Sequence, residues 1–261
     1  MAVSSPTRPP SPTPCTAVGR VETAVFPSLT AGNMDVRIYL PPCYGGDDHD
    51  YPVLYMLPGN IHTAAFWDEL GLDETAEQLI TSQQIPPIII IMPDGGAVAN
   101  NTSGGPGSYE TVILNDLLPF MEANYCAATA PGLRAIGGVS RGGYWSLEIA
   151  FRHPDQFSAV GGHSAALLDI AAGPYLNPQV TGLSHNLDGL RIYLDIGRED
   201  YVIHNIQKLH DDMALNSIAH TWVLNEGEHN EVYWAAHLTE YLIWYAAPWS
   251  FNRGSYASCL Q

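Results

Sequence analysis

The sequence predicts an α/β fold: a mostly parallel central sheet, an antiparallel hairpin at its N-terminal end, and helices on both faces. Three observations predict it. The runs 52–57 and 87–92 are unbroken apolar segments, which is typical of parallel strands that helices cover on both faces. From residue 52 onward, strand-like and helix-like segments alternate, as in right-handed crossover connections. Before residue 52, two β-like runs flank a short turn, which predicts the hairpin.

Length and composition fit one domain after a short linker. The chain has 261 residues, of which 46% are hydrophobic, so residues 17–261 form the expected single domain with a substantial core. Residues 1–16 are rich in Ser, Thr and Pro and predict an extended, disordered linker. Such linkers often follow an export signal or a lipoprotein anchor. We therefore expect an exported protein, secreted or at the cell surface, whose signal lies outside this sequence.

Four cysteines support export. Cys15 and Cys43 bracket the β-like runs 18–26 and 34–40, and the turn 28–33 lies close to the midpoint between them. In an antiparallel hairpin the two cysteines would face each other, so we predict a Cys15–Cys43 disulfide. Cys126 and Cys259 are left for a second bridge that would tie the C-terminal tail to the body. The alternative is four free thiols in a cytosolic protein.

The other elements follow in order. After the hairpin, the loop 41–51 contains an acidic cluster without a recognised ligand spacing, so a solvated turn is expected and no metal site. Beyond it, strands are expected at 52–57, 87–92, 133–139, 157–162, 190–196 and 220–224, and helices at about 65–82, 110–125, 141–152, 201–216 and 231–246. The segments 97–107 and 169–189 are rich in Gly, Asn or Pro and predict loops, the second a lid or pocket wall.

The charge balance disfavours some classes of binding partner. The chain has 27 acidic and 10 basic residues, a formal net charge of −17, and Lys208 is its only lysine. This balance argues against nucleic acid or an anionic membrane as a partner. No apolar run is long enough to span a membrane as a helix, so no transmembrane segment is expected. The oligomeric state is left open.

The segment Gly138-Val139-Ser140-Arg141-Gly142 carries the chemistry. It follows an apolar strand and leads into a helix, and Gly-x-Ser-x-Gly in that context predicts a nucleophile elbow. Glycines two before and two after the serine let the strand and the helix pass without a side-chain clash. The Ser140 oxygen would then stand exposed at the sheet edge, beside the amino end of a helix that favours an oxyanion. The alternative is a Gly-rich turn with an idle serine.

A serine nucleophile needs a histidine base, and the base needs a carboxylate that fixes its tautomer. In this architecture the chain order is Ser, then Asp or Glu, then His. Asp200 lies just past the strand 190–196 and is the expected acid, with Glu199 as second choice. Asp195 lies inside that strand and is expected to cap or buttress its end.

His229 is the expected base, because it directly follows the next strand, 220–224. Two backbone donors are needed for the oxyanion. The N–H of Arg141 is one, and the N–H of Asn60, in the loop after the strand 52–57, is the other. The Asn60 side chain could instead contact substrate or serve the turn. No cofactor is expected.

These motifs together resemble the esterase-D-like family of α/β-hydrolases. That family includes feruloyl esterases, S-formylglutathione hydrolases, enterochelin esterases and the antigen 85 mycolyltransferases. The resemblance covers roughly residues 35–245 and rests on several segments in order. These segments are 55–59 with Phe66-Trp67, Ile91-Met92-Pro93-Asp94-Gly95, the 138–143 nucleophile region, 151–157, 197–200 and 227–229.

The resemblance implies the α/β-hydrolase fold, with Ser140 as nucleophile, Asp200 as acid and His229 as base. Two positions depart from the family pattern. Pro58 stands where the family usually has His before Gly, and His163 stands near a position that is usually small. These departures bear on the pocket and on how the oxyanion loop is held, not on the class of chemistry.

The sequence thus predicts a secreted serine carboxylesterase that forms an acyl-enzyme on Ser140. Feruloyl or acetylxylan esters, small or linked to polysaccharide, are the first substrate expectation, because export and aromatic content favour them. An acyltransferase of antigen 85 type and a non-catalytic binding protein of the same fold are the alternatives. S-formylglutathione hydrolysis is disfavoured, because that reaction takes place in the cytosol and this protein is expected to be exported. The expected substrate-binding residues are Trp67, Tyr109, His163 and Trp234, although each could equally pack in the core.

Overall fold

The computed structural model describes residues 15–167 and 172–259 of the chain. Eight strands form one sheet in the order β1-β2-β4-β3-β5-β6-β7-β8. The strands are β1 (Arg20–Ser28), β2 (Gly32–Leu40), β3 (Val53–Leu57), β4 (Ile89–Pro93), β5 (Arg134–Val139), β6 (Ala159–His163), β7 (Arg191–Gly197) and β8 (Thr221–Asn225). β1 and β2 pair antiparallel, β2 joins β4 antiparallel, and the remaining pairs are parallel. The predicted mostly parallel sheet with an N-terminal hairpin is confirmed.

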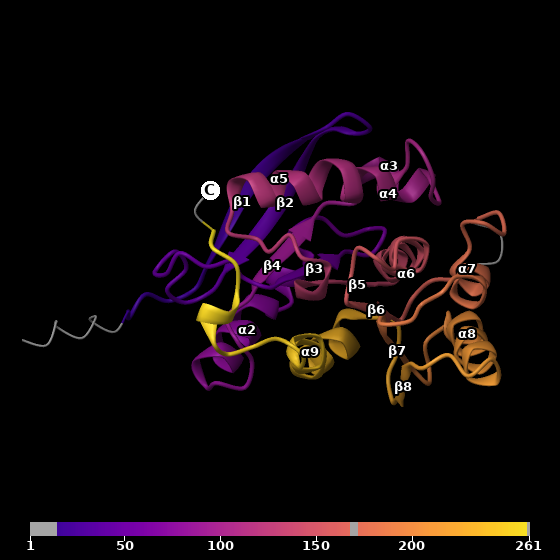
Figure 1. Cartoon of the computed structure of the whole chain (residues 1–261). Coiled ribbons are helices and arrows are strands. Elements are labelled where there is room, and N and C mark those ends of the chain that lie inside the picture. The colour runs from indigo at the N-terminus through magenta and orange to yellow at the C-terminus, as the bar shows by residue number, and fades with distance from the viewer. Residues whose placement is uncertain (1–14, 168–171, 260–261) are drawn as a thin grey trace, which may run out of the picture.

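Helices cover both faces of this sheet (Figure 1). The helices are α1 (Phe66–Glu69), α2 (Leu72–Thr81), α3 (Gly96–Asn101), α4 (Tyr109–Thr111), α5 (Leu118–Asn124), α6 (Arg141–Arg152), α7 (Pro178–Ser184), α8 (Ile203–Leu215) and α9 (Glu231–Ala246). One apolar layer packs α1, α2 and α9 against the sheet. The other packs α5, α6 and α8 against the opposite face. The strands β3, β4 and β5 between these layers are buried throughout, as their unbroken apolar sequences predict.

Four predicted segments differ in detail. The helix expected over 65–82 is two helices, because Gly71 between them has a left-handed backbone with φ of 91°. The helix expected over 110–125 contains a π-helical stretch, Val112–Leu117. The expected loop 97–107 begins with the helix α3, and the expected irregular segment 169–189 contains α7. Asn177 caps α7 by accepting a hydrogen bond from the Gln179 N–H. An Asn followed by Pro is a helix-start signal, but the Gly, Pro and Asn content of the segment favoured a loop.

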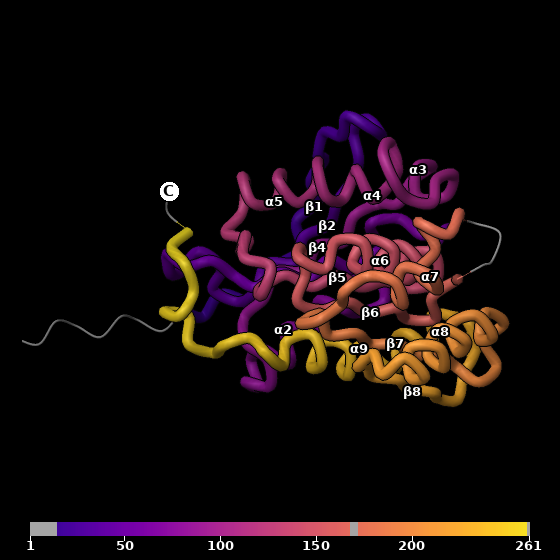
Figure 2. Tube along the Cα trace, turned by 45° about the vertical axis from the view of Figure 1, so that its right-hand side comes forward, coloured from indigo at the N-terminus to yellow at the C-terminus, as the bar shows by residue number. Residues whose placement is uncertain are grey.

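Both cysteine pairs form the expected disulfides, Cys15–Cys43 and Cys126–Cys259. The first closes the open end of the β1–β2 hairpin. The second fastens the C-terminal tail, which runs from α9 back to the N-terminal side of the molecule (Figure 2). The tail also pairs with the loop 41–51, through the backbone bridge between His49 and Ser258. Most of the predicted linker, residues 1–14, lies outside the described residues.

The topology brings the segments that follow the parallel strands to one edge of the sheet. In a parallel sheet, the segments that leave the carboxyl ends of neighbouring strands emerge together. β3 and β5 end in register, with Leu57 opposite Gly138, and β7 and β8 end with Gly197 opposite Asn225. The loops after β3, β5, β7 and β8, which carry the predicted catalytic and oxyanion residues, therefore emerge at one edge, and so does the loop after β4, which is parallel to β3.

Candidate active site

Ser140 occupies a strained turn between β5 and α6. Its backbone has φ of 56° and ψ of −118°, a conformation that non-glycine residues rarely adopt. Hydrogen bonds hold it there: the Ser140 N–H donates to the His163 carbonyl at 3.0 Å, and its carbonyl accepts from the Tyr144 and Ala166 N–H groups at 3.0 and 2.9 Å. Strain of this kind persists only where the surrounding structure imposes it, and it concentrates at functional sites.

The two glycines of the pentad have the steric role that the sequence predicts. A Cβ atom on Gly138 would lie 2.6 Å from the backbone of Gly142 and 2.7 Å from the Leu57 carbonyl oxygen. A Cβ atom on Gly142 would lie 2.5 Å from the Pro58 carbonyl oxygen. Any side chain at either position would push α6 away from β3 and β5. The glycines therefore allow the close approach that aims residue 140 at the sheet edge.

His229 and Asp200 are in direct contact. Nδ1 of His229 lies 2.9 and 2.8 Å from the two carboxyl oxygens of Asp200. The Asp200 side chain is fully buried and that of His229 is 8% exposed. Asp200 also accepts a hydrogen bond from the Val202 N–H at 2.9 Å, which fixes its carboxylate. This geometry places the proton of the neutral imidazole on Nδ1 and leaves the Nε2 lone pair free to accept a proton.

Neighbouring carboxylates have other partners. Glu199 accepts the Gly227 N–H at 2.8 Å, so it braces the loop that precedes His229. Asp195 lies on β7, where it contacts His163 and accepts the hydroxyls of Tyr233 and Tyr241. Asp200 is thus the carboxylate in contact with His229, and Asp195 buttresses the strand ends, as the sequence analysis expected of it.

The loop after β3 connects the nucleophile to the base. A Cβ atom on Gly59 would lie 3.6 Å from Cβ of Ser140 and 2.8 Å from Nδ1 of His62. The His62 ring stacks on Phe66 at 3.9 Å, and its edge faces Trp234. Trp234 in turn packs edge-on against His229, with ring centroids 5.1 Å apart. Ser140 and His229 therefore flank one continuous cluster at the sheet edge.

The hydrogen bonds among the described residues do not include one between the Ser140 hydroxyl and Nε2 of His229. Serine–histidine contacts in unliganded hydrolases are often long and shorten only when substrate binds. The contact between the Ser140 hydroxyl and Nε2 of His229 is therefore one that we expect to form in the substrate complex.

The two expected oxyanion donors lie beside a common support, the helix α3. Arg141 is the first residue of α6, so its N–H has no acceptor within that helix. The Arg141 side chain donates to the Ala99 carbonyl at 3.0 Å and to the Thr102 carbonyl. On the other side, the Asn100 side chain donates to the Asn60 carbonyl at 2.9 Å. The expected loop 97–107 thus positions both segments, and its helix is part of the site.

All four expected substrate-binding residues are buried, which corrects that expectation. Trp67 and Tyr109 are 1% exposed, and their polar atoms donate to the carbonyls of Leu57 and Asp94. His163 is fully buried between Asp195 and Tyr245. The aromatic rings of these three residues bury well in the core, and each of their polar atoms finds a hydrogen-bond partner there. Trp234 is also buried, but it lies directly behind the His229 ring and supports it.

Two polar residues at the site were not anticipated. Nε2 of His62 lies 3.2 Å from the Glu231 carboxylate, and this contact joins the loop after β3 to the start of α9. Glu231 comes two residues after His229, and its pKa is lowered, chiefly by hydrogen bonding to its own N–H and also by the neighbouring His62. His62 comes two residues after Asn60, so both residues lie just outside the segments that carry the predicted motifs. Their partnership needed the fold.

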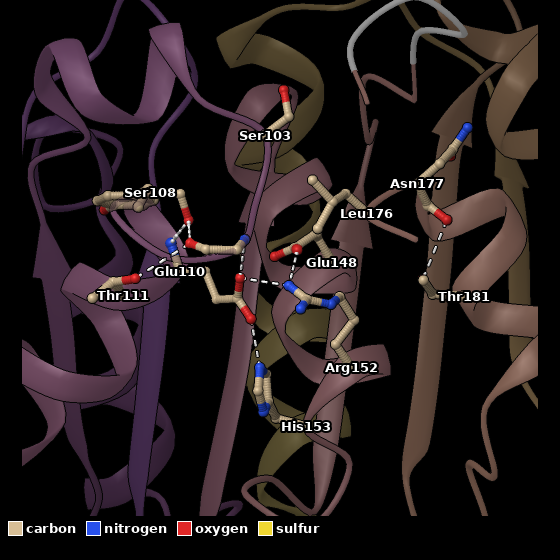
Figure 3. Close-up of polar contacts among 12 residues, drawn as sticks. Ser103, Ser108, Glu110, Thr111, Glu148, Arg152, His153, Leu176, Asn177 and Thr181 are labelled. Atoms are coloured by element: carbon tan, nitrogen blue, oxygen red, sulfur yellow. Dashed lines mark hydrogen bonds and ion pairs between the residues drawn. The ribbon is translucent and has the colours of Figure 1, made fainter. Parts of the chain in front are cut away.

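A buried acidic cluster holds the segment that follows α3 (Figure 3). Glu110 accepts the Gly105 N–H, and Arg152 donates to Glu110 at 2.5 Å and to Glu148 at 2.8 Å. Glu148 is fully buried, and its second oxygen has no hydrogen-bond partner among residues 15–167 and 172–259. Burial, together with the charge of Glu110, raises the pKa of Glu148 to about 8. This shift favours the protonated carboxyl of Glu148 at neutral pH, directly beneath Gly104.

Comparisons with known proteins agree with this architecture. The family model described as "Putative esterase" matches residues 28–245. Esterase Rv1288 of Mycobacterium tuberculosis is 36% identical over 145 residues, which are 52% of this chain and 30% of that protein. An endo-1,4-beta-xylanase/feruloyl esterase of Xylanibacter ruminicola is 28% identical over 156 residues, 55% of this chain and 21% of that protein. The chain therefore spans less than a third of the length of either relative.

Two solved structures show the same fold. A ferulic acid esterase superposes with a TM-score of 0.80 at 22% identity, and covers 90% of this chain and 100% of its own. An S-formylglutathione hydrolase from Staphylococcus aureus superposes with a TM-score of 0.76 at 16% identity, with the same coverage. Identities this low show the α/β-hydrolase fold, which confirms the predicted fold, and they leave the substrate to be argued from the site.

Proposed function

The chain belongs to the esterase family, and from this premise we propose that it is a serine carboxylesterase with Ser140 as nucleophile, His229 as base and Asp200 as acid. The observation that carries the proposal is the buried His229–Asp200 contact of 2.8 Å, at the same sheet edge as a serine in a strained turn. That arrangement supplies the three side chains that ester cleavage by an acyl-enzyme needs, in the required chain order.

The proposed reaction has two halves. Ser140 attacks the ester carbonyl while Nε2 of His229 takes the hydroxyl proton, and Asp200 stabilises the imidazolium that forms. The N–H groups of Arg141 and Asn60 hold the oxyanion, an interaction worth about 3–4 kcal/mol per donor in well-studied hydrolases. His229 then passes its proton to the leaving alcohol. In the second half His229 activates water, which cleaves the acyl-enzyme and frees Ser140.

Feruloyl or acetylxylan-type esters are the substrates we propose. Two similar proteins are named for feruloyl or ferulic acid ester cleavage, and they are the basis of this choice. Charge supports an uncharged ester: the chain has a formal net charge of −17, and the loops around His229 carry Glu199, Glu226, Glu228 and Glu231. A glutathione thioester would bring further negative charge to this rim, so the glutathione conjugate is the less favoured substrate.

We propose that the protein works outside the cytosol. Its two disulfides need an oxidising compartment to persist. No helix within residues 15–167 and 172–259 is long and apolar enough to cross a membrane.

The test is ester hydrolysis by a pair of matched serine variants. We expect the wild type to hydrolyse p-nitrophenyl acetate and methyl hydroxycinnamates, and Ser140→Ala to abolish turnover. Ser146→Ala, on the same helix but with its hydroxyl bonded to the Gly142 carbonyl, keeps turnover close to wild type. Circular dichroism checks that both variants fold. Undiminished hydrolysis by Ser140→Ala would refute the assignment.

The same proteins discriminate the two alternatives. A fluorophosphonate probe labels wild type and Ser146→Ala at Ser140 if the site is catalytic, and it leaves Ser140 unlabelled in a non-catalytic binding protein. Product analysis with an added sugar or alcohol separates hydrolysis from acyl transfer, because a transferase yields the new ester in preference to the free acid.

A further inference from the structure

Three segments near His229, two loops and the start of α9, each expose a large apolar side chain. Ile61 is 82% exposed, Tyr201 75% and Val232 80%. Ile61 follows the proposed oxyanion donor Asn60, Tyr201 follows Asp200, and Val232 comes three residues after His229. Isolated exposed apolar residues need no explanation, but several at the mouth of one site favour contact with a ligand.

Contacts bring these three segments together around His229. The Tyr201 ring lies 4.6 Å from the His229 ring, tilted by 52°, so it extends the wall of the site from the base into solvent. The 3.2 Å contact between His62 and Glu231 joins the segment that carries Ile61 to the segment that carries Val232. His62 is itself fixed by stacking on Phe66. The three apolar residues therefore belong to a braced rim and not to independent loops.

The chemistry decides which half of an ester meets this rim. His229 donates a proton to the leaving alcohol, so the alcohol oxygen must come within hydrogen-bond reach of its Nε2. The carbonyl oxygen points instead toward the N–H groups of Arg141 and Asn60. Two rings lie against His229, the buried Trp234 and the exposed Tyr201. The group attached to the alcohol oxygen thus passes beside the exposed one, Tyr201.

We propose that Ile61, Tyr201 and Val232 form a subsite for the alcohol half of the substrate, and that it selects uncharged alcohol groups of about the size of a ring. This rests on the esterase function proposed above and adds the specificity of its leaving group. An aromatic face stacks on the apolar face of a sugar or aryl ring. The carboxylates on the same segments disfavour an anionic alcohol: Glu226 is paired with Arg198 at 2.9 Å, and Glu231 is paired with His62 at 3.2 Å.

The experiment varies the two halves of the ester separately. One series fixes the acetyl group and compares methyl with benzyl acetate, whose alcohols have similar acidity. The other fixes methanol and lengthens the acyl chain from acetate to butyrate and hexanoate. The variants are Tyr201→Ala, Val232→Thr and Tyr201→Phe. Leu215→Ala is the matched control, because Leu215 is equally exposed but ends α8 at the opposite edge of the sheet.

We expect Tyr201→Ala to lower the benzyl-to-methyl ratio of kcat/KM by about three- to tenfold, the loss of one apolar contact face. Val232→Thr lowers it by a smaller factor, since only one methyl group is replaced by a hydroxyl. Tyr201→Phe and Leu215→Ala retain the wild-type ratio, and the acyl-length series is the same in all variants.

An unchanged ratio in Tyr201→Ala would overturn the subsite while leaving the esterase function intact. The subsite would also be overturned if the benzyl-to-methyl ratio fell and the acyl-length dependence changed by the same factor. Such a pattern would mean that Tyr201→Ala displaces His229 and does not act on the alcohol half alone. A wild type that cleaves no ester in either series would overturn the proposed function itself, and the subsite with it.

Discussion

Two aspartate–histidine pairs, one within the sheet and one in the loops beyond β7 and β8, have nearly the same local geometry and different surroundings. His229 contacts Asp200 at 2.8 Å, and His163 contacts Asp195 at 2.6 Å, in both cases through Nδ1. Nε2 of His163 meets the Tyr245 hydroxyl at 3.0 Å, and its ring stacks on Tyr241 at 3.7 Å. His229 instead lies at the sheet edge, beside the exposed Tyr201.

The difference teaches that a carboxylate and an imidazole do not by themselves make a catalytic base. In both pairs the carboxylate holds Nδ1, so reactivity depends on what Nε2 faces. Tyr245 closes that position in the core pair. Burial and the charge of Asp195 raise the pKa values of Tyr241 and Tyr245 far above the usual value, so both keep their hydroxyl protons. The core pair is therefore a closed hydrogen-bond network, and only the edge pair has a free lone pair.

The core pair still serves the site through the backbone. The His163 carbonyl accepts the Ser140 N–H at 3.0 Å, and the Asp195 carbonyl accepts the Ser164 N–H at 2.9 Å. The network among β6, β7 and α9 thus sets the position from which Ser140 projects. One pair is expected to perform the chemistry and the other to hold the strand ends.

Replacing each histidine gives the largest expected contrast. We expect His229→Ala to reduce ester turnover by at least about 10³-fold, because the base is lost, with little change in urea unfolding. His163→Ala removes one partner of a buried pair and lowers the free energy of unfolding by about 3–5 kcal/mol. Turnover and urea unfolding of both variants measure the contrast. It is broken if His163→Ala folds normally yet loses turnover as fully as His229→Ala.

Replacing each acid sharpens the contrast further. An amide at position 200 no longer fixes the His229 tautomer, so we expect Asp200→Asn to reduce kcat by about 10²- to 10⁴-fold. Asp195→Asn mainly destabilises the fold. The new NH₂ group would face either the two tyrosine hydroxyls or the His163 imidazole, all of which donate hydrogen bonds to Asp195 in the wild type. Glu199→Gln is the control, because its amide oxygen still accepts the Gly227 N–H. If Asp195→Asn or Glu199→Gln were the crippling change instead, the proposed acid is misplaced.

Glu148 extends the comparison to a buried acid without enough donors. Asp195 has donors for both oxygens, whereas one oxygen of Glu148 has none in the described part of the chain. The pKa of Glu148 is raised from 4.5 to about 8. Between these values the folded protein keeps a proton that the unfolded chain releases. Stability therefore falls as the pH rises through this window, by up to about 1.4 kcal/mol per pH unit, and is level above it.

Glu148→Gln removes this proton linkage at nearly constant shape. We expect the variant to lose less stability than wild type between pH 5 and pH 8, and to unfold at a higher temperature than wild type at pH 9. Thermal unfolding at several pH values measures the effect, with Glu69→Gln, an exposed glutamate, as control. Parallel pH curves for wild type and Glu148→Gln would mean that Glu148 is charged in the fold.

Local patterns in the sequence were enough to predict the architecture and the elbow. The apolar runs of β3 and β4 are typical of strands covered on both faces. The glycines around Ser140 permit the close approach of β5 and α6. Chain order alone singled out Asp200 and His229, and hairpin geometry alone paired Cys15 with Cys43. These inferences depend on residues close in sequence or on fixed strand order, so one chain suffices to make them.

Only the tertiary structure decided which side chains face the site. Trp67, Tyr109 and His163 have the chemistry of pocket residues, yet packing places all three in the core. His62 and Glu231 are 169 positions apart, and nothing in their local sequence announces their contact. The physical reason is that burial and partnership depend on how elements far apart in the chain pack together. The sequence determined which residues lie in the loops at the carboxyl edge of the sheet. The packing determined which side chains each of them contacts.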